Sequence, residues 1–485
     1  MVYSIAFPPK AFLSFVLACI AVNGRPTIGN VRRVHSGLTS RSNTVLPVAQ
    51  FSVAISGTAP RSKAKKELMK VLRSSSSSNF TSPVAGSDFD EEYLTNVTIG
   101  GQDFTLIVDT GSSDTWVAKQ GFACFDLSGN PVPTSQCAFG TNGFDTSASP
   151  TYFPIPNTNF NISYGDGEFL TGDMAFDTVT VGGMTVPHQE LGLVTNAAWL
   201  GDGIDTGLMG LASPNLTSAF EGTDPDADEW PKTQIPYNPL FYTAVQNGIV
   251  SEPYFSVALN RGSFEAENSS LYDPDLGYIA FGGIAPVPVT STVVTVPIQG
   301  YDASTFLPSN GTRVTYFYYT VDVESMSFTG NTQVFGTTND IILDTGTTLN
   351  YVPTDVADAF AAAFDPPATW DDDFGLYVFS CGNSTVPEFT VNIAGTTFVV
   401  DPEDNVLPLG VNDDDGNEVC ASGTTDGGPN ENGNIFILGD TFLHNVVTTF
   451  NIHTDEVTIT QREVYSSGIS TTSSRRRRRT TGRNL

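Results

Sequence analysis

The same short acidic segment occurs twice in this chain of 485 residues, and this repeat constrains the fold more than any other feature. Residues 108–116 read VDTGSSDTW, and residues 343–351 read LDTGTTLNY. In both copies an apolar run leads into Asp-Thr-Gly, and two small hydroxyl residues follow it. A single Asp-Thr-Gly is compatible with an ordinary turn, but two in matched settings predict two similar lobes. We therefore expect Asp109 and Asp344 to face each other near a pseudo-two-fold axis.

A second matched feature supports two equivalent halves. About a hundred residues after each copy, an apolar pair is followed by glycine, at residues 208–210 and again at residues 437–439. A third Asp-Thr-Gly at residues 205–207 lacks this setting, because no apolar strand precedes it and Leu208 follows it. We interpret Asp205 as a turn residue without a catalytic role.

The residue types of the repeat suit a pair of interacting carboxyl groups. Ser112 and Thr347 can donate hydrogen bonds to carboxylate oxygens, and glycine allows neighbouring backbone to come close. Two carboxyl groups a few ångströms apart do not both ionise easily, so the pair holds one proton over a range of acidic pH. The ionised member can take a proton from a water molecule while the protonated member polarises a carbonyl group.

Short segments rich in β-branched and aromatic residues alternate with Gly, Pro, Asn and Asp clusters from residue 92 onward. This pattern predicts a mostly antiparallel β protein. The best helical signal is TDVADAFAAAF at residues 354–364, with Thr354 as the candidate N-cap. Residues 221–237 are predicted to form an acidic surface loop.

The N-terminus indicates entry into a secretory pathway. Lys10 precedes an apolar run that is too short to span a bilayer, and small residues follow it. We expect no other membrane span. Residues 25–85 are basic and end in a serine run, which we interpret as a propeptide and a linker, with Lys65-Lys66 as a processing site. The alternative is a disordered basic arm without an inhibitory role.

An oxidising compartment favours disulfides among the cysteines that remain after Cys19. Four cysteines allow three connectivities, and we favour the local pairs Cys124–Cys137 and Cys381–Cys420. Seven Asn-X-Ser/Thr sites fit a glycosylated, secreted protein, and they start at Asn79, Asn96, Asn161, Asn215, Asn268, Asn310 and Asn383.

Charge is distributed very unevenly. Between residues 86 and 461 there are only four Lys and Arg of the chain's 22, whereas all but two of its 52 acidic residues lie there. Such a body repels nucleic acid, so we expect no nucleic-acid partner. At low pH most of these carboxyls are neutral and few fixed cations remain, which predicts adaptation to an acidic medium. Solubility is the alternative explanation of the acidity.

Five segments in this order resemble the pepsin-like family of aspartic proteases. They are DTGSSDTW, ISYGDG at residues 162–167, GLMGLASP at residues 207–214, DTGTTLNY and ILGDTFL at residues 437–443. The resemblance covers roughly residues 92–460. It implies an all-β, bilobal fold with pseudo-two-fold related lobes, few short helices and a long cleft for an extended peptide. Asp109 and Asp344 match the family's catalytic pair, supported by Gly111, Ser112, Gly346 and Thr347.

The resemblance also implies a hairpin flap over the cleft. Tyr164 matches the flap tyrosine, Trp116 matches the tryptophan that supports it, and Gly165 and Asp166 would offer backbone groups to substrate. Asp166 also resembles the flap acid of fungal members, which accepts a basic substrate side chain, although a turn-favouring residue explains it equally well. Both cysteine pairs lie where the family has its disulfides. By the same analogy the basic propeptide would cover the acidic cleft, with Lys63, Lys65, Lys66 or Lys70 near the aspartates.

Some features depart from the family pattern. Gly101 stands in TIGGQDF (residues 98–104) where the family commonly has Thr-Pro. The long loops at residues 221–237 and 301–313 mean that the family pattern does not define the exact walls of the cleft. Asn161 is a possible glycan site beside the flap, where a glycan would narrow access if the site is used.

These observations predict a secreted aspartic endopeptidase that is made as a zymogen and hydrolyses peptide bonds at acidic pH. The predicted divisions are a signal peptide (1–24), a basic propeptide and Ser-rich linker (25–85), an N-terminal catalytic lobe (86–290), a C-terminal catalytic lobe (291–462) and a polar, basic tail (463–485). The expected partners are a protein or peptide substrate and the chain's own propeptide, and we expect an extracellular monomer rather than a vacuolar or cell-wall protein.

Other classes of function fit the sequence less well. A catalytically silent binding protein on the same fold is the main alternative, and a carbohydrate-binding β-sandwich would leave the five ordered segments unexplained. The chain has no Gly-X-Ser-X-Gly or His-Glu-X-X-His segment. Its four histidines are not at close ligand spacing, so we expect no metal and no cofactor.

Overall fold

The computed structural model describes residues 33–34, 49, 51–58, 92–165, 167–201, 203–261, 273–302, 314–372, 374–413, 415–430 and 436–465. The predicted signal peptide, the serine run, the Lys65-Lys66 site, the propeptide lysines and the arginine-rich end lie outside these residues. Asp166, at the predicted flap tip, also lies outside them.

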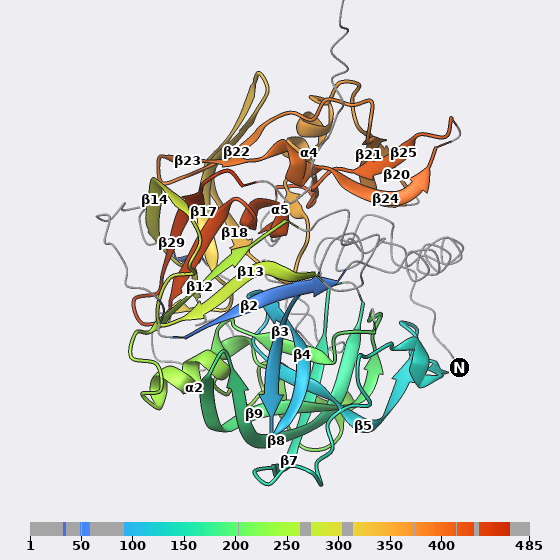
Figure 1. Ribbon diagram of the computed structural model, residues 1–485, viewed down its shortest axis with the longest axis vertical. Coiled ribbons are helices and arrows are strands. Elements are labelled where there is room, and N and C mark those ends of the chain that lie inside the picture. Colours follow the sequence, from blue (N-terminus) through green and yellow to red (C-terminus); the bar gives the residue numbers. More distant parts are fainter. Residues whose placement is uncertain are drawn as a thin grey trace, which may run out of the picture.

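Two β-rich lobes are joined by a sheet that passes between them (Figure 1). Within the described residues there are only three α-helices, all short: α2 (Leu240–Gln246), α4 (Thr354–Ala361) and α5 (Asp440–Leu443). The prediction of an all-β, bilobal fold with few short helices is therefore confirmed.

The N-terminal lobe is built from one end of a 15-stranded sheet. Its strands follow the order β11 (Ala219–Glu221), β7 (Phe153–Ser163), β8 (Phe169–Val181), β9 (Met184–Ala198), β5 (Thr115–Phe125), β10 (Gly207–Gly210), β4 (Gln102–Asp109) and β3 (Glu92–Ile99), with β6 (Pro131–Val132) paired to β5. The short 3₁₀ turns η2 (Thr134–Gln136), η3 (Pro214–Leu216) and η4 (Pro225–Ala227) lie in its connections. Buried aliphatic and aromatic side chains of β4, β5, β8 and β9 form the core of this lobe.

The same sheet continues into the junction between the lobes. The order there is β2 (Phe51–Thr58), β13 (Asp273–Phe281), β12 (Tyr254–Leu259), β28 (Val446–Asn451), β29 (Glu456–Arg462) and β14 (Val289–Pro297). Strand β2 belongs to the segment predicted as a propeptide, and it lies between β3 and β13 with Ile55 fully buried. This part of the segment is therefore an integral strand and not a loose arm.

The C-terminal lobe contains two further sheets. One follows the order β23 (Thr396–Val400), β22 (Phe389–Ile393), β17 (Thr320–Phe328), β18 (Asn331–Leu343), β27 (Phe436–Leu438), β19 (Asn350–Val352) and β26 (Thr424–Asp426). The other contains β20 (Thr369–Asp371), β21 (Leu376–Ser380), β25 (Glu418–Ala421) and β24 (Leu407–Asn412), with the turn η6 (Pro402–Asn405) before β24. A small sheet of β1 (Arg33–Val34), β15 (Gly300–Asp302) and β16 (Val314–Thr315) completes the described strands.

Helix α4 corrects one detail of the sequence prediction. The helix was expected at residues 354–364 and occurs at Thr354–Ala361, with Val356 and Phe360 on its buried face. Its N-cap is Pro353, so the prediction of Thr354 as the cap is wrong. Thr354 lies inside the first turn, and its hydroxyl donates to the carboxylate of Asp426 at 2.7 Å. The proline before it sets the extended backbone from which the helix starts.

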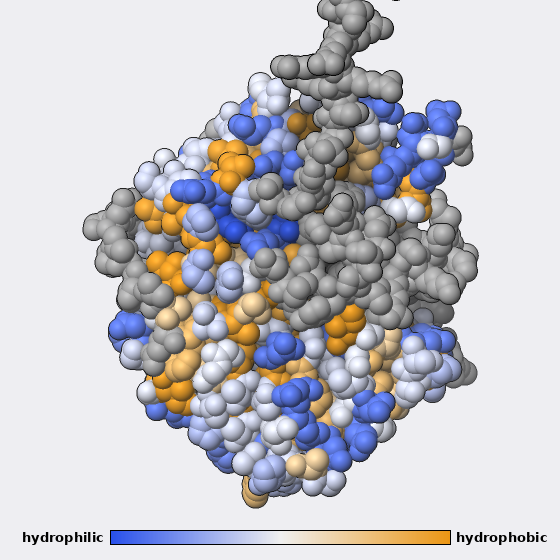
Figure 2. All heavy atoms as spheres, viewed as in Figure 1, coloured by the Kyte–Doolittle hydropathy of each residue, from blue (hydrophilic) through white to orange (hydrophobic). Residues whose placement is uncertain are grey.

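Polar and apolar side chains are mixed over the face of the molecule shown in Figure 2. Such mixing is normal for a folded chain, because apolar atoms make up much of any protein surface. Among the described residues, no helix has the length and apolar character needed to cross a membrane.

Candidate active site

Asp109 and Asp344 occupy equivalent positions in the two lobes. Asp109 ends β4, which pairs in parallel with β10, and Gly210 lies opposite Asp109 in that pairing. Asp344 directly follows β18, which pairs in parallel with β27 through Leu343 and Leu438. The apolar pairs found about a hundred residues after each aspartate in the sequence thus belong to the strands beside them. Each lobe supports its aspartate with the same local arrangement.

Each carboxyl group is held by the residues that follow it. Ser112 donates its hydroxyl to Oδ2 of Asp109, and the amide of Gly111 donates to Oδ1 at 2.6 Å. On the other lobe, Thr347 donates its hydroxyl to Oδ2 of Asp344 at 2.7 Å. This pattern fixes the orientation of the carboxyl groups at the ends of their strands.

Because Gly111 and Gly346 have no side chain, each carboxyl group can lie against the glycine of the opposite loop. A Cβ atom placed on Gly111 would collide with the carboxyl group of Asp344, and one placed on Gly346 would lie 2.6 Å from Oδ1 of Asp109. The contacts are reciprocal, as the repeat predicts. Both aspartates are nearly buried, with 6% and 8% of their surfaces exposed.

The two loops are also joined by their threonines. Thr110 donates its hydroxyl to the carbonyl of Leu343 at 2.9 Å, and Thr345 donates its hydroxyl to the carbonyl of Val108 at 2.7 Å. Each hydroxyl also accepts the backbone N–H of the other threonine, at 3.0 and 3.1 Å. Four buried hydrogen bonds therefore hold the aspartates in register. This role of the threonines was not predicted, although their presence in both copies of the motif was a usable signal.

Burial raises the pKa of Asp109 well above its ordinary value, and the neighbouring charge of Asp344 raises it further. The hydrogen bonds from Ser112 and Gly111 oppose this shift without cancelling it. Asp109, which lies next to a second carboxyl group, therefore keeps its proton under acidic conditions. This is the electrostatic signature of a pair that shares one proton.

The β7–β8 hairpin carries the residues predicted for the flap, and Trp116 of β5 contacts it. Tyr164 follows β7 and accepts a hydrogen bond on its hydroxyl from the indole nitrogen of Trp116, at 2.7 Å. Trp116 is fully buried, so it provides a fixed point for this contact. Gly165 is exposed in the turn of the hairpin. The prediction for Asp166 concerns a residue outside the described part of the chain.

Comparisons with known proteins agree with this geometry. The family model described as eukaryotic aspartyl protease matches residues 92–462. The chain belongs to the eukaryotic aspartyl protease family. It is 38% identical over 407 residues to a probable aspartic-type endopeptidase of Aspergillus fumigatus, covering 81% of this chain and 82% of the relative. It is 30% identical over 382 residues to rhizopuspepsin of Rhizopus chinensis, covering 78% of this chain and 80% of the relative.

A solved structure shows the same fold. The aspartic proteinase of Irpex lacteus aligns with a TM-score of 0.59 at 19% identity, covering 85% of this chain and 97% of that one. The predicted membership of the pepsin-like aspartic proteases, and with it the enzyme class of aspartic-type endopeptidase, is confirmed by these relatives.

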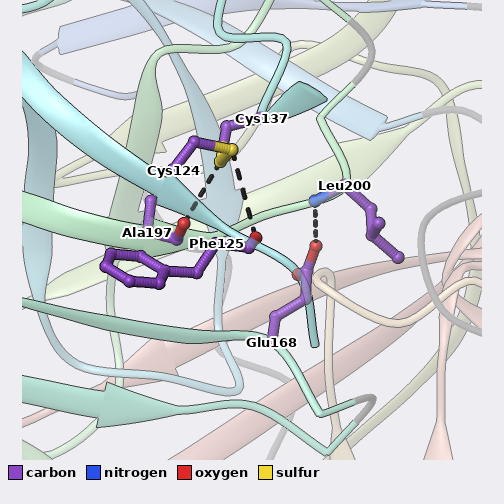
Figure 3. Close-up of a disulfide and its surroundings, with 6 residues drawn as sticks. All are labelled: Cys124, Phe125, Cys137, Glu168, Ala197 and Leu200. Atoms are coloured by element: carbon purple, nitrogen blue, oxygen red, sulfur yellow. Dashed lines mark hydrogen bonds between the residues drawn. A yellow bond between two sulfur atoms is a disulfide. The ribbon is translucent and has the colours of Figure 1, made fainter. Parts of the chain in front are cut away.

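Two disulfides close local loops of 13 and 39 positions, one in each lobe. Cys124 in β5 is bonded to Cys137, and Cys381 after β21 is bonded to Cys420 in β25, which are the local pairs favoured by the sequence. Figure 3 shows the first disulfide together with Glu168, which lies at the turn end of the β7–β8 hairpin and accepts the backbone N–H of Leu200 on its carboxylate at 2.6 Å.

Asp114 and Glu190 form an acidic pair in the N-terminal lobe that was not predicted from the sequence. Asp114 is fully buried, and its Oδ1 accepts the hydroxyl of Tyr237 at 2.6 Å and the backbone N–H of Ser218 at 2.9 Å. Burial raises the pKa of Asp114 to about 6. Burial, and then the charge of Asp114, raise the pKa of Glu190 to about 7. In the C-terminal copy of the motif the equivalent position is Leu349, so this cluster belongs to one lobe only.

Asp205, interpreted from the sequence as a turn residue, lies two residues before β10 and not in a turn. It is fully buried, and its Oδ2 accepts the indole N–H of Trp199 at 3.2 Å. Trp199 in turn packs edge-to-face on Trp116 and Tyr164, with ring centroids 5.1 and 5.9 Å apart. The third Asp-Thr-Gly therefore supports the aromatic wall beside the flap. Within the described residues, no group of three or more His, Cys, Asp and Glu side chains is placed to hold a metal ion.

Proposed function

We propose that this protein is an endopeptidase that hydrolyses peptide bonds at acidic pH with a water molecule activated between Asp109 and Asp344. The observation that carries the proposal is the reciprocal packing of each carboxyl group against the glycine of the opposite loop. That packing supports the proposal because it brings each of the two nearly buried carboxyl groups against the loop that carries the other.

The two aspartates have different tasks in this reaction. The ionised carboxylate accepts a proton from the water, and the resulting hydroxide attacks the carbonyl carbon of the scissile peptide. The protonated carboxyl donates to the carbonyl oxygen as it becomes tetrahedral. The intermediate collapses when the amide nitrogen leaves with a proton from the pair. Ser112 and Thr347 keep the carboxyl groups in orientation through these steps.

Tyr164 and Trp116 support the binding of an extended peptide. The hydroxyl of Tyr164 is fixed by the buried indole, so the flap residue is oriented before substrate arrives. The exposed backbone at Gly165 would add hydrogen bonds to the substrate main chain. Asp166 is proposed from the sequence to contribute to substrate binding as well. Pre-orientation reduces the entropy lost on binding.

Acidic conditions are supported by three observations. The pKa of Asp109 is raised by burial and by Asp344, so the required proton is present at acidic pH. The body between residues 86 and 461 carries only four fixed cations. A relative from Saccharomycopsis fibuligera, 28% identical over 371 residues, is named an acid protease.

Secretion as a zymogen is part of the proposal. The apolar run near the N-terminus and the basic residues 25–85, opposite in charge to the body, support it. Strand β2 supports it further, because this part of the predicted propeptide is built into the sheet between the lobes. The predicted lobe boundary near residue 290, glycosylation, the monomeric state and the extracellular location remain proposals of the same kind.

The decisive experiment measures cleavage of a denatured protein or a peptide library at about pH 3.5. Asp109→Asn and Asp344→Asn should each reduce kcat by about 10²–10⁴-fold, because each removes one proton-transfer group. Asp226→Asn is the control, since it removes an exposed carboxyl far along the chain from both motifs. An inhibitor that mimics the tetrahedral state should abolish wild-type cleavage. Equal activity in the wild type and all three variants would refute the catalytic role of Asp109 and Asp344. Tight inhibitor binding without turnover would identify a catalytically silent binding protein.

A further inference from the structure

The acidic loop at residues 221–237 lies against the flap hairpin. It begins in β11, which pairs antiparallel with β7 along the edge that β8 does not use. Beyond β11, the backbone N–H of Gly222 donates to the carbonyl of Asn157 at 3.0 Å. The outer edge of the flap strand is therefore covered by a segment that the sequence predicts only as surface loop.

One buried carboxylate fastens this loop to two positions of the flap strand. Asp228 is only 3% exposed, and it accepts hydrogen bonds from the amide nitrogens of Asn159 at 3.2 Å and Asn161 at 2.8 Å. The two asparagines are two residues apart, so they lie on the same face of β7. Asn161 also donates to the carbonyl of Pro225 at 3.0 Å. Because this nitrogen is the atom that would carry a glycan, the described conformation leaves the Asn161 site engaged by protein.

The loop is closed on itself and anchored at its far side. Thr233 donates its N–H to the carbonyl of Glu229 at 2.9 Å, and its own carbonyl accepts the N–H of Glu221 at 2.8 Å. The ring of Trp230 lies 6.1 Å from the ring of Phe317, which is buried just before β17 of the C-terminal lobe. The loop thus contacts both the flap hairpin and the chain that enters the other lobe.

We infer that Asp228 is a positioning residue for the flap. By holding Asn159 and Asn161, it braces the last residues of β7 against the lobe junction, three residues before Tyr164. A braced hairpin keeps Tyr164 near Trp116, and it therefore loses less conformational entropy when an extended peptide binds. The predicted effect on substrate binding rests on the proposed function. If the contacts of Asp228 with Asn159 and Asn161 are removed, we expect the substrate to bind more weakly.

The test compares Asp228→Ala with Asp226→Ala, an exposed acid in the same loop. In the proteolytically active protein, Asp228→Ala should raise KM for a long peptide about tenfold and change kcat less than about twofold, whereas Asp226→Ala should match the wild type. Amide hydrogen exchange in the full chain should become faster in peptides that cover residues 153–170 and 221–237, and not elsewhere. Asp228→Asn retains one acceptor oxygen for the asparagines and should recover part of the effect.

A double-mutant cycle isolates the contact itself. Asn161→Ala combined with Asp228→Ala should be less harmful than the sum of the two changes, because both remove the same hydrogen bond. Unchanged exchange and KM in a folded Asp228→Ala protein would overturn the inference. Faster exchange throughout the chain would also overturn it, since it would indicate general destabilisation. If the wild type cleaves no peptide, the proposed function fails, and the exchange comparison still decides whether the brace exists.

Discussion

At the scale of single residues, Gly111 sets how closely the two loops can meet. Gly111→Ala should reduce kcat/KM by about 100-fold, because a Cβ there collides with the Asp344 carboxyl group and displaces it from its partner. The measurement is peptide cleavage at acidic pH, with circular dichroism as a check of folding. Gly382→Ala is a matched control, since a Cβ there meets no atom within 4 Å and the residue is exposed. Full activity in Gly111→Ala would show that the two carboxyl groups need not approach each other.

Residue-level predictions from the sequence succeeded where one short motif contains all the partners. Asp109, Ser112 and Gly111 interact within four positions, so their arrangement follows from local spacing. Asp114 lies in the same motif, but its partner Tyr237 is 123 positions away. No pattern near Asp114 shows that its carboxyl group is buried, and only the fold brings the two residues together.

At the scale of elements, Asp114 before β5, Glu190 in β9 and Tyr237 after β11 form one cluster. We expect this cluster to make the folded N-terminal lobe less stable as the pH rises toward neutral. Asp114 has a pKa of about 6 in the folded protein, above its ordinary value of 3.8. Below pH 3.8 the group is protonated in both states and has no effect on the pH dependence. As pH rises toward 6, the unfolded chain ionises first, so folded stability falls by about 3 kcal/mol for this group.

The pH dependence can be measured from thermal unfolding between about pH 4 and 8. Asp114→Asn should flatten the loss of Tm over this range, and Glu190→Gln should flatten its upper part, because the pKa of Glu190 is raised to about 7. Glu221→Gln is the control, since this carboxyl group is exposed at the end of β11. An identical decline in all these variants would place the sensitivity elsewhere.

Elements were predicted well when their own pattern defined them. Alternating residues marked most of the strands, and the alanine-rich segment marked α4, although its cap was assigned wrongly. The loop at residues 221–237 was predicted only as an acidic surface, because its pairing with β7 joins segments about sixty positions apart. Buried Asp228 inside that loop could not be distinguished from its exposed neighbours by sequence alone.

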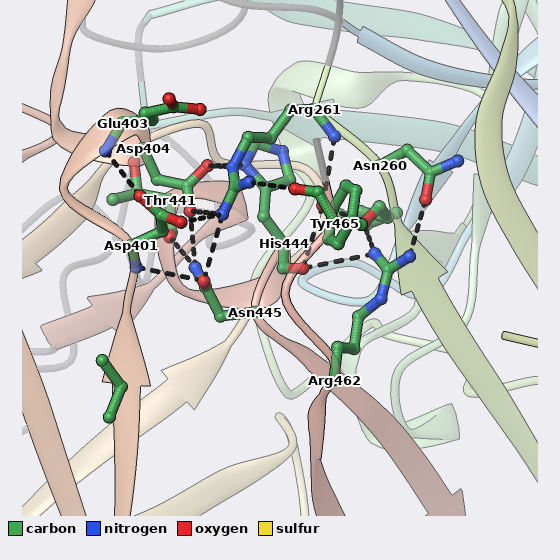
Figure 4. A network of polar contacts seen from close by, with 12 residues as sticks. Asn260, Arg261, Asp401, Glu403, Asp404, Thr441, His444, Asn445, Arg462 and Tyr465 are labelled. Carbon is green, nitrogen blue, oxygen red and sulfur yellow. Dashed lines mark hydrogen bonds and ion pairs between the residues drawn. The ribbon is translucent and has the colours of Figure 1, made fainter. Parts of the chain in front are cut away.

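At the scale of the whole molecule, the two lobes are also joined by a buried polar network (Figure 4). Arg261, which follows β12, donates from Nη2 to Oδ2 of Asp404 at 2.8 Å, and its Nε contacts Oδ1. Nδ1 of His444 lies 3.0 Å from Oδ1 of Asp404, and Nε2 of His444 contacts the hydroxyl of Tyr93. Strand β3, the junction sheet and the C-terminal lobe therefore share one set of contacts.

The bilobal plan was predictable from the repeat, because two copies of one motif imply two copies of its surroundings. The junction was not. Strand β2 comes from a basic segment whose sequence resembles a linker, and its place in the sheet depends on β13, more than 200 positions later. No sequence pattern around His444 or Asp404 indicates that these two residues, 40 positions apart, are buried partners.

This network should respond to pH in the opposite sense to the Asp114 cluster. Burial alone would raise the pKa of Asp404, but the hydrogen bonds and charges of His444 and Arg261 outweigh it and lower that pKa below its ordinary value. Its stabilising effect is therefore complete above the ordinary value of 3.8 and is lost as pH falls through the lower folded value. Asp404→Asn should cost about 3 kcal/mol in urea unfolding at pH 6, because buried Arg261 loses its nearer carboxylate partner and, among the described residues, keeps only Asp401 at 3.5 Å, and the cost should shrink at about pH 2. Glu403→Gln, the exposed neighbour, should be neutral at both values, and a pH-independent cost in Asp404→Asn would mean that shape rather than charge joins the lobes here.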